Sequence, residues 1–242
     1  MITLAEVEKL GRVHTVEPTV LSVYLNVPLS PAELPGLSDR VGELVAAAAR
    51  TAGRSGRLRE EDRRSARDEA ALAGPGWLGH PVAIFACAEV GLLEVVGLPE
   101  ARPGTSPEWA VLGVRPHIRP LLAALQPSPR LTAEILADEI PAGPAAALMA
   151  IGLPACLAAV NAGAVDTLAV PYDGLVPGYE CGRCGALGLA ADCCPDWGTA
   201  SLPVPDLIEE MVSRTLEDGG RVLVVHDTPG RIAARTRYPV AP

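Results

Sequence analysis

The chain has 242 residues, of which 49% are hydrophobic and 3% aromatic, so aliphatic side chains must build its core. This length allows one large or two small domains, and the composition excludes a disordered chain. The formal net charge of −9 does not indicate nucleic-acid binding by the whole chain. Any contact with RNA therefore has to come from a local basic patch, and we expect no DNA partner.

The first residues, MITLAEVEKLGRVHTV, lack the basic segment and apolar run of an export signal. No window approaches 18 consecutive apolar residues either. We therefore expect a cytoplasmic protein with no membrane partner. Six cysteines in such a chain favour free thiols or metal ligands over disulfides.

A first α/β domain is expected over residues 1–126. Its elements are predicted from apolar runs, helical spacing and turn residues. In chain order they are a buried strand over residues 20–27, a helix from residue 37 to near Gly53, a charged helix over 57–73 that ends at Gly74-Pro75-Gly76, a hairpin formed by 81–87 and 91–98, a strand over 108–114 and a short helix over 118–125.

A linker is expected at residues 127–130, because two prolines in three residues disfavour helix on both sides. A second α/β domain is expected over 131–242, where helices and strands alternate. Its predicted elements are a helix over 131–140, a helix carrying Leu153, Cys156, Leu157 and Val160, a strand over 167–171, a helix over 206–217 and strands over 221–226 and 231–238.

The helix over 206–217 has the clearest start and stop signals in the chain. Asp206 is the expected N-cap, Glu209 follows three residues later as in a capping box, and Gly219 is the expected stop. The segment Asp227-Thr228-Pro229-Gly230 is read as the turn between two antiparallel strands. It does not indicate a GTPase, because the chain's only lysine, Lys9, lies in no glycine-rich loop.

Residues 179–198 (YECGRCGALGLAADCCPDWG) predict an inserted knuckle with metal ligands. Cys181 and Cys184 form a CxxC motif, whose thiolates can meet one tetrahedral Zn²⁺. The second half is irregular, because Trp197 stands where a fourth thiolate is expected after Cys194, and Cys193 is the residue left to replace it. The alternatives are a hairpin in which Trp197 packs where a metal would bind, and a redox CxxC motif.

A run of six arginines begins where the two N-terminal helices meet, namely Arg54, Arg57, Arg59, Arg63, Arg64 and Arg67. Acidic residues interleave with most of the run, which indicates a solvated helix face with i, i+4 ion pairs. Arg54, Ser55 and Arg57 precede the acids and are the candidate RNA-binding residues. Hydrolytic catalysis has little support, because the four histidines are scattered and no nucleophile motif is present.

The order of these motifs resembles the archaeo-eukaryotic class-one release factor and Pelota family. VLSVYLNVP, the helices around AGRSGR and the hairpin VAIFACAEVGLLEVV are similar to its N-terminal domain. GLPACLAAVNAGAVDTLAVP, the CGRC knuckle and DLIEEMVSRTLEDGGRVLVVHD are similar to its C-terminal domain. The resemblance implies that the C-terminal domain is an α/β/α sandwich of the kink-turn-binding ribosomal-protein type with a zinc-ribbon-like insertion.

Two departures from the family change the expected function. The middle domain, which carries Gly-Gly-Gln in release factors, is absent, and the chain's only Gly-Gly, Gly219-Gly220, is followed by Arg221. The codon-reading loop Asn-Ile-Lys-Ser is replaced by Ala52 to Arg57. We therefore expect neither peptidyl-tRNA hydrolysis nor codon reading, and predict a protein that is not an enzyme.

The resemblance implies a ribosome-associated translation factor of the Balon-like hibernation group. It implies binding near the decoding-site rRNA in the A site of idle ribosomes, in hibernation or rescue, with an elongation-factor-type GTPase as a further partner. The alternative is a protein-binding adaptor that no longer acts on the ribosome.

Overall fold

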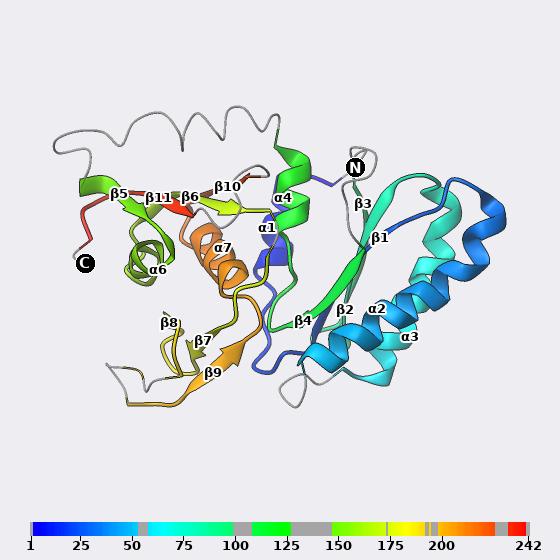
Figure 1. The fold of residues 1–242 in the computed structure, drawn as a ribbon, viewed down its shortest axis with the longest axis horizontal. Coiled ribbons are helices and arrows are strands. Elements are labelled where there is room, and N and C mark those ends of the chain that lie inside the picture. Colours follow the sequence, from blue (N-terminus) through cyan, green and yellow to red (C-terminus); the bar gives the residue numbers. More distant parts are fainter. Residues whose placement is uncertain are drawn as a thin grey trace. The chain divides into compact units, whose positions relative to one another are not determined.

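The structure is a computed structural model that describes residues 2–52, 58–98, 108–126, 147–172, 174–191, 194, 198–225 and 232–240. The chain divides into two compact units, residues 1–117 and 118–242, and each has its own sheet (Figure 1). The predicted α/β class is confirmed for both. Within the described residues, every helix is too short or too polar to cross a lipid bilayer.

The first unit is built on an antiparallel sheet in the order β3-β2-β1-β4. The strands confirm the predicted strand over 20–27, the hairpin and the strand over 108–114. Their bounds are β1 (Val20–Asn26), β2 (Pro81–Cys87), β3 (Leu92–Gly97) and β4 (Trp109–Gly113).

Two helices, α2 (Leu37–Ala52) and α3 (Glu60–Ala73), pack together on one face of this sheet (Figure 1). Leu37, Val41 and Val45 recur at i, i+4 and i+8, so they share the buried face of α2. Short 3₁₀ turns precede α2 and follow α3, namely η1 (Pro31–Gly36) and η2 (Gly74–Gly76). The second of these coincides with the Gly-Pro-Gly cluster that was predicted to end the charged helix.

The arginines on α3 have acidic neighbours, as the pattern of interleaved charges predicted. Arg63 pairs with Glu60 at 3.6 Å on the same helix, and Arg67 reaches Asp39 on α2 at 3.3 Å. Arg54, Ser55 and Arg57 lie outside the described residues.

One helix of this unit was not predicted, α1 (Leu4–Gly11). Thr3 and Glu6 form a capping box at its start, in which each side chain accepts a hydrogen bond from the other residue's backbone N–H. The Thr-x-x-Glu signature at Thr3 and Glu6 is the local sequence signal for the start of this helix.

The second unit is built on a mixed sheet in the order β10-β6-β11-β5. Its strands are β5 (Met149–Ile151), β6 (Val165–Pro171), β10 (Arg221–Val225) and β11 (Ala233–Thr236). Helices α6 (Leu153–Asn161) and α7 (Leu207–Glu217) cover one face of this sheet (Figure 1). The helix predicted over 131–140 lies outside the described residues.

The strand arrangement corrects one prediction about the turn at residues 227–230. Strand β10 runs parallel to β6 while β11 runs antiparallel to it, and β6 lies between the two. Strands β10 and β11 therefore do not form a hairpin, although they are consecutive in the sequence. The turn residues themselves lie outside the described part of the chain.

Helix α4 (Arg119–Leu125) was predicted as the end of the first domain but belongs to the second unit. The division between the units falls at His117 and Ile118, earlier than the expected linker at 127–130, which lies outside the described residues. Gln126 helps to explain this placement. Its side-chain amide donates to Val222 O and accepts from Val224 N, both at 2.9 Å, and so bonds to strand β10.

Candidate metal centre

A small sheet of β7 (Gly178–Cys181), β8 (Leu187–Gly188) and β9 (Ser201–Val204), with the segments that join its strands, carries Cys181, Cys184 and Cys194. It is inserted between β6 and α7 and runs antiparallel in the order β8-β7-β9 (Figure 1). Side chains of the flanking helices hold it in place. Asn161 of α6 makes two hydrogen bonds to the backbone of Leu187, at 2.8 and 2.9 Å. Arg214 of α7 donates to Gly185 O at 2.6 Å.

Two tight turns in this insertion have the same backbone hydrogen bonds. In the first, Gly185 N–H donates to Cys181 O at 2.8 Å, and in the second Gly198 N–H donates to Cys194 O at 2.7 Å. The two glycines have φ values of 73° and 62°, in the left-handed region that glycine adopts most readily. Cys181 and Cys194 also each donate their N–H to the carbonyl five residues ahead. The insertion therefore contains two segments with the same backbone hydrogen bonds, one that begins at Cys181 and one that begins at Cys194, and we call them half-sites.

The half-sites differ in the residue three positions after the first cysteine. In the first half-site this residue is Cys184, whereas in the second it is Trp197. The second half-site therefore has the same backbone hydrogen bonds as the first, but tryptophan replaces cysteine at one position. This difference corresponds to the irregular second half of the motif in the sequence. Cys193 and Trp197 both lie outside the described residues.

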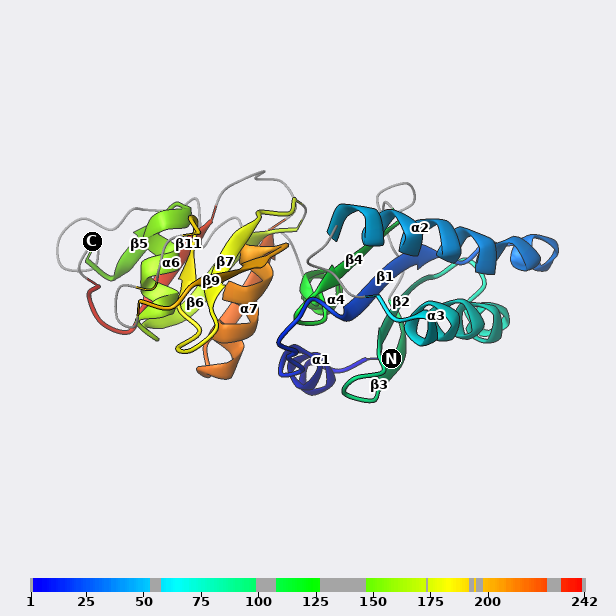
Figure 2. The same ribbon diagram turned by 90° about the horizontal axis from the view of Figure 1, so that it is seen from below.

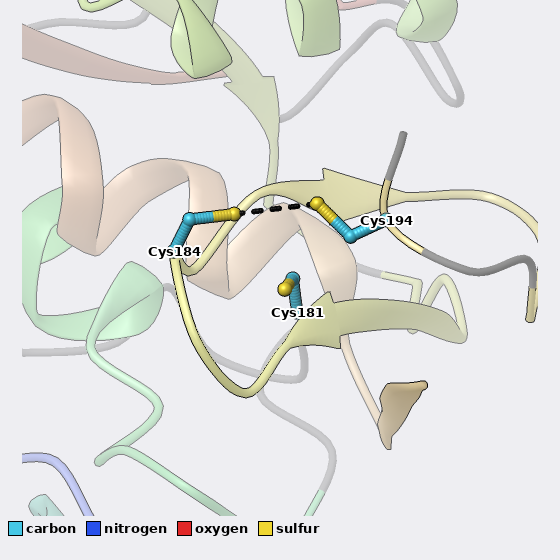
Figure 3. A group of neighbouring side chains, drawn as sticks. All are labelled: Cys181, Cys184 and Cys194. Atoms are coloured by element: carbon cyan, nitrogen blue, oxygen red, sulfur yellow. Dashed lines mark hydrogen bonds between the residues drawn. The ribbon is translucent and has the colours of Figure 1, made fainter. Parts of the chain in front are cut away.

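The sulfur atoms of Cys181, Cys184 and Cys194 converge (Figure 3). All three lie within 4.8 Å of one another, and the Sγ atoms of Cys184 and Cys194 are 3.5 Å apart. Tetrahedral zinc with Zn–S bonds of about 2.3 Å needs sulfur–sulfur separations of about 3.8 Å. The three cysteines are therefore placed to hold a metal ion of this kind, from the end of β7, the turn after it and the segment between β8 and β9.

Local hydrogen bonds favour the thiolate at Cys181. The backbone N–H of Cys184, the Thr199 hydroxyl and the backbone N–H of Arg183 lower the pKa of Cys181 to about 6. At Cys184 the Ala186 N–H lowers the pKa, but burial and the sulfurs of Cys181 and Cys194 raise it above its ordinary value. The neighbouring sulfurs thus disfavour a second thiolate at Cys184. A bound cation would offset the repulsion between the thiolates and so stabilise both of them.

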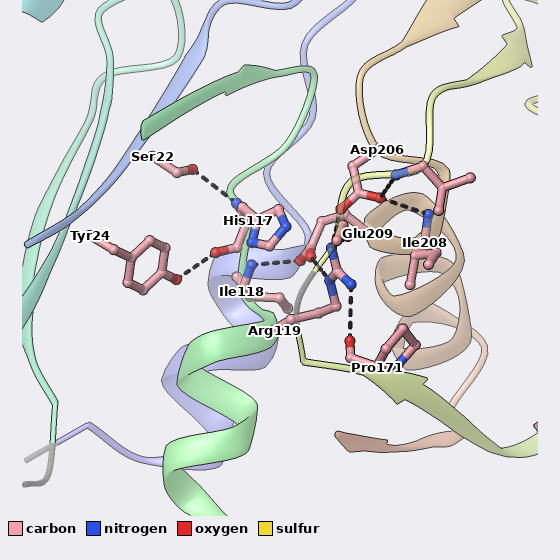
Figure 4. Close-up of polar contacts among 11 residues, drawn as sticks. Ser22, Tyr24, His117, Ile118, Arg119, Pro171, Asp206, Ile208 and Glu209 are labelled. Atoms are coloured by element: carbon pink, nitrogen blue, oxygen red, sulfur yellow. Dashed lines mark hydrogen bonds and ion pairs between the residues drawn. The ribbon is translucent and has the colours of Figure 1, made fainter. Parts of the chain in front are cut away.

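The second unit also contains a buried ionic cluster that the sequence analysis did not predict (Figure 4). Arg119, at the start of α4, is 1% exposed and forms ion pairs with Asp206 and Glu209 of α7, the latter at 3.1 Å. Its guanidinium also donates to the carbonyls of Pro171 and Gly174, each at 3.0 Å. These contacts link the start of α4 to α7 and to the end of β6, which indicates a structural role.

The same cluster changes the role predicted for Glu209. Asp206 caps α7 as predicted, and its Oδ1 accepts from Ile208 N–H at 3.2 Å. Glu209 does not complete a capping box. Its carboxylate accepts instead from the Ile118 N–H and from Arg119 Nε. The spacing of Asp206 and Glu209 gave no signal of this, because their partner lies about 90 residues earlier in the chain.

In the first unit, His117 has structural contacts. It is 3% exposed, its N–H donates to Ser22 Oγ at 2.9 Å, and its carbonyl accepts from the Tyr24 hydroxyl (Figure 4). Its ring packs edge-on against Trp109 with centroids 4.7 Å apart. These contacts show a packed core histidine.

Comparison with known proteins finds no matching family model and no matching curated protein. Among solved structures, the chain is similar to the C-terminal domain of a peptide chain release factor from Methanosarcina mazei, with 22% sequence identity and a TM-score of 0.28. The match covers 46% of this chain and 79% of that one.

Proposed function

We propose that this chain is a non-catalytic, ribosome-associated translation factor of the release factor and Pelota type, which binds the A site of idle ribosomes in hibernation or rescue. The observation that carries the proposal is the position of the cysteine-bearing sheet in the second unit. It is inserted into an α/β unit between β6 and α7, and this is the arrangement that the sequence resemblance implies for the family's C-terminal domain.

A role without catalysis is supported by the use that the fold makes of the chain's only Gly-Gly pair. Gly219 has a φ of 72°, and its N–H donates to Leu216 O while the Gly220 N–H donates to Thr215 O. This is the Schellman pattern that ends a helix. The pair is thus occupied in stopping α7.

Zinc is the metal that we propose for the three cysteines, with a structural role. Thiolate-rich sites suit Zn²⁺, and sites closed by protein ligands stabilise folds without leaving a position for substrate. Cys193 is the candidate fourth ligand. Bound zinc would hold the two half-sites together, since few residues of so small a sheet are buried.

The RNA contact is assigned to Arg54, Ser55 and Arg57, which join α2 to α3. Two arginines of α3, Arg63 and Arg67, pair with acids. Arg54 and Arg57 precede the acids of that helix in the sequence, so they are the arginines most available to phosphates. An elongation-factor-type GTPase is the proposed protein partner.

Sedimentation of the tagged full chain through a sucrose gradient of stationary-phase lysate tests this function. We expect co-migration with 70S ribosomes or a subunit, and a steep loss of co-migration as salt rises. The double variant Arg54→Ala/Arg57→Ala should leave the ribosomal fractions at lower salt than the wild type. Arg12→Ala/Arg221→Ala is the matched control, because it removes two exposed arginines elsewhere.

Failure of the wild type to co-migrate with any ribosomal particle would contradict the proposal. A salt-insensitive association with non-ribosomal proteins would instead favour an adaptor that has left the ribosome. Equal behaviour of the two double variants would remove the assignment of the Arg54 to Arg57 loop.

A further inference from the structure

A cavity of about 640 Å³ lies in the first unit between α1 and β3, which are both labelled in Figure 2. One wall is a single face of α1 and the residues after it. Glu6, Lys9, Leu10 and Val13 line the cavity, and their spacing of i, i+3, i+4 and i+7 places them along one side of the helix. We call this cavity the α1–β3 groove.

The opposite wall is the edge of strand β3. Glu94, Val95, Val96 and Gly97 all line the groove. Successive strand residues point to opposite faces of a sheet, so a cavity lined by four in a row must follow the strand's edge. Trp77 lines the groove beside Gly97 and packs so closely that a Cβ on this glycine would lie 2.0 Å from the indole ring.

Strand β3 is the last strand of its sheet, and among the described residues it pairs only with β2. The Leu98 N–H donates to Pro81 O at 2.9 Å, which fixes the residues that face β2. Because antiparallel pairs alternate, Val96, Glu94 and Leu92 also bond to β2. The backbone N–H and C=O groups of Leu93, Val95 and Gly97 therefore point away from β2, along the groove.

No described residue bonds to these outward groups. They repeat every two residues, or about 7 Å, which matches the repeat of a second extended chain. An unpaired strand edge of this kind is a template for another strand. A compact small molecule could form hydrogen bonds with the backbone groups of one of these three residues but not with those of all three.

The charged groups of the groove lie mainly on the helix wall. The Glu6 carboxylate accepts from the backbone N–H and hydroxyl of Thr3. Lys9, the chain's only lysine, is exposed and makes no side-chain hydrogen bond or ion pair within the described residues. His14 lies on the same side, and Glu94 lies on the strand wall. Lys9 is therefore the lining residue that could pair with an acid of a ligand, whereas Glu6 and Glu94 would repel further negative charge.

We propose that the α1–β3 groove binds an extended peptide segment of another protein, which adds to β3 as a further strand. The peptide's backbone bonds to Leu93, Val95 and Gly97, and apolar side chains at alternate positions pack on Leu10, Val13 and Trp77. A carboxylate of the peptide pairs with Lys9. The site is a second interaction surface and is independent of the proposed ribosomal role.

Selection of phage-displayed random octapeptides on the full chain, followed by fluorescence anisotropy with the enriched peptide, tests the proposal. Every second amide N–H of the bound peptide should bond to β3, so N-methylation of that set of amides should abolish binding. N-methylation of the other set of alternate amides, whose N–H groups point away from β3, should leave the affinity within about twofold. Enriched peptides should share alternating apolar residues and an acid.

Two protein variants test the two walls. Val95→Pro removes an N–H that points away from β2, so peptide binding should fall at least tenfold. The substitution removes no hydrogen bond to β2, and proline is tolerated at such positions of edge strands, so the sheet should still form. Lys9→Gln should weaken binding by up to about fivefold, the size of an exposed ion pair, and Lys9→Arg should restore it. Arg12→Gln, one turn along the same helix and outside the groove lining, should have no effect.

The proposal is overturned if no octapeptide is enriched, or if N-methylation of the two sets of amides weakens binding equally. Concentration-dependent dimerisation that is lost in Val95→Pro would also overturn it, by making a second copy of this chain the occupant. Should Val95→Pro fail to fold, the methylated peptides still decide the matter on the wild type. Ribosome sedimentation can succeed or fail independently of each result.

Discussion

Arg119 is the residue whose surroundings depart most from its expected preference for water. Arginine is rarely fully buried unless its charge is paired, and here two carboxylates and two backbone carbonyls surround the guanidinium. Replacing such an arginine leaves the buried acids without a counter-charge. The stability lost in this way is larger than the stability that the ion pairs add relative to apolar residues at the same positions. The cluster therefore ties α4 to α7 and to the end of β6.

Arg119→Ala is expected to lower the free energy of unfolding by about 3–5 kcal/mol, because Asp206 and Glu209 would remain buried and uncompensated. Urea unfolding followed by far-UV circular dichroism measures the change. The control is Arg235→Ala, which breaks an exposed pair with Asp166 (Nε–Oδ2 2.9 Å) and should cost less than about 1 kcal/mol. Similar losses in the two variants would contradict the structural role of the cluster.

Cys184→Ser should reduce the zinc affinity of the purified chain by more than about tenfold, because it removes one of three converging thiolates. Metal analysis by mass spectrometry reads the zinc content, and chelator should lower the Tm of the wild type but not of the variant. Cys156→Ala is the control, since burial raises the pKa of the Cys156 thiol to about 12 and it lies outside the cluster. Equal zinc content in both variants would show that the cysteines do not form the site.

Asp62 is another buried charged residue, and its burial has a different consequence. Its side chain is buried, with one oxygen accepting from Ala88 N–H at 2.6 Å and the other lacking a hydrogen-bond partner. Burial raises the pKa of this carboxyl, against the opposing effect of the Ala88 hydrogen bond. The folded state thus binds its proton more tightly than the unfolded state, and Asp62's contribution to stability falls as pH rises from about 3.9 through the raised pKa.

Asp62→Asn is therefore expected to raise the urea midpoint at pH 7, because the amide keeps the acceptor for Ala88 and carries no charge. The advantage should disappear near pH 3, where the wild-type carboxyl is protonated. Asp68→Asn, at an exposed position of the same helix, should leave the midpoint nearly unchanged at both pH values. A lower midpoint for Asp62→Asn at pH 7 would contradict this account.

At the scale of elements, α7 shows which signals are local. Asp206 caps its first turn and Gly219 ends it, both as predicted, because each acts through backbone groups within a few residues. Strands β1 to β4, β6, β10 and β11 were also predicted, whereas β5, the strands of the insertion and the strand order were not. Placement of β6 between β10 and β11 depends on contacts between segments more than 50 residues apart, which turn residues do not encode.

Gly219→Ala is expected to cost about 1 kcal/mol, because a residue with a Cβ is strained at a φ of 72° even though the surrounding space is open. Gly76→Ala is the matched control. Its site is equally open and has no positive φ, so the change should stay within about 0.5 kcal/mol. Thermal unfolding of the two variants gives the comparison, and an equal effect would show that conformation at Gly219 is not the cause.

At the scale of the whole molecule, each unit has its own sheet and its own buried residues. Units of this kind generally fold alone. Residues 1–117 and residues 118–242, expressed separately, should each give a dispersed ¹H–¹⁵N NMR spectrum that overlays on part of the full-chain spectrum. Division at residue 126 should instead destabilise the second part, because it removes Arg119 and Gln126. A stable 127–242 fragment would contradict the placement of α4.

Features that depend on neighbours along the chain could be predicted from the amino-acid sequence. These were the α/β class, most strands and helices, the ends of α7 and the three cysteines that the structure brings together, because periodicity, caps and short ligand spacings act within a few residues. The strand order, the unit to which α4 belongs, the burial of Arg119 and the groove along β3 became visible in the folded structure alone. Each of these depends on side chains that meet only after distant segments have packed, and no local pattern specifies such a meeting.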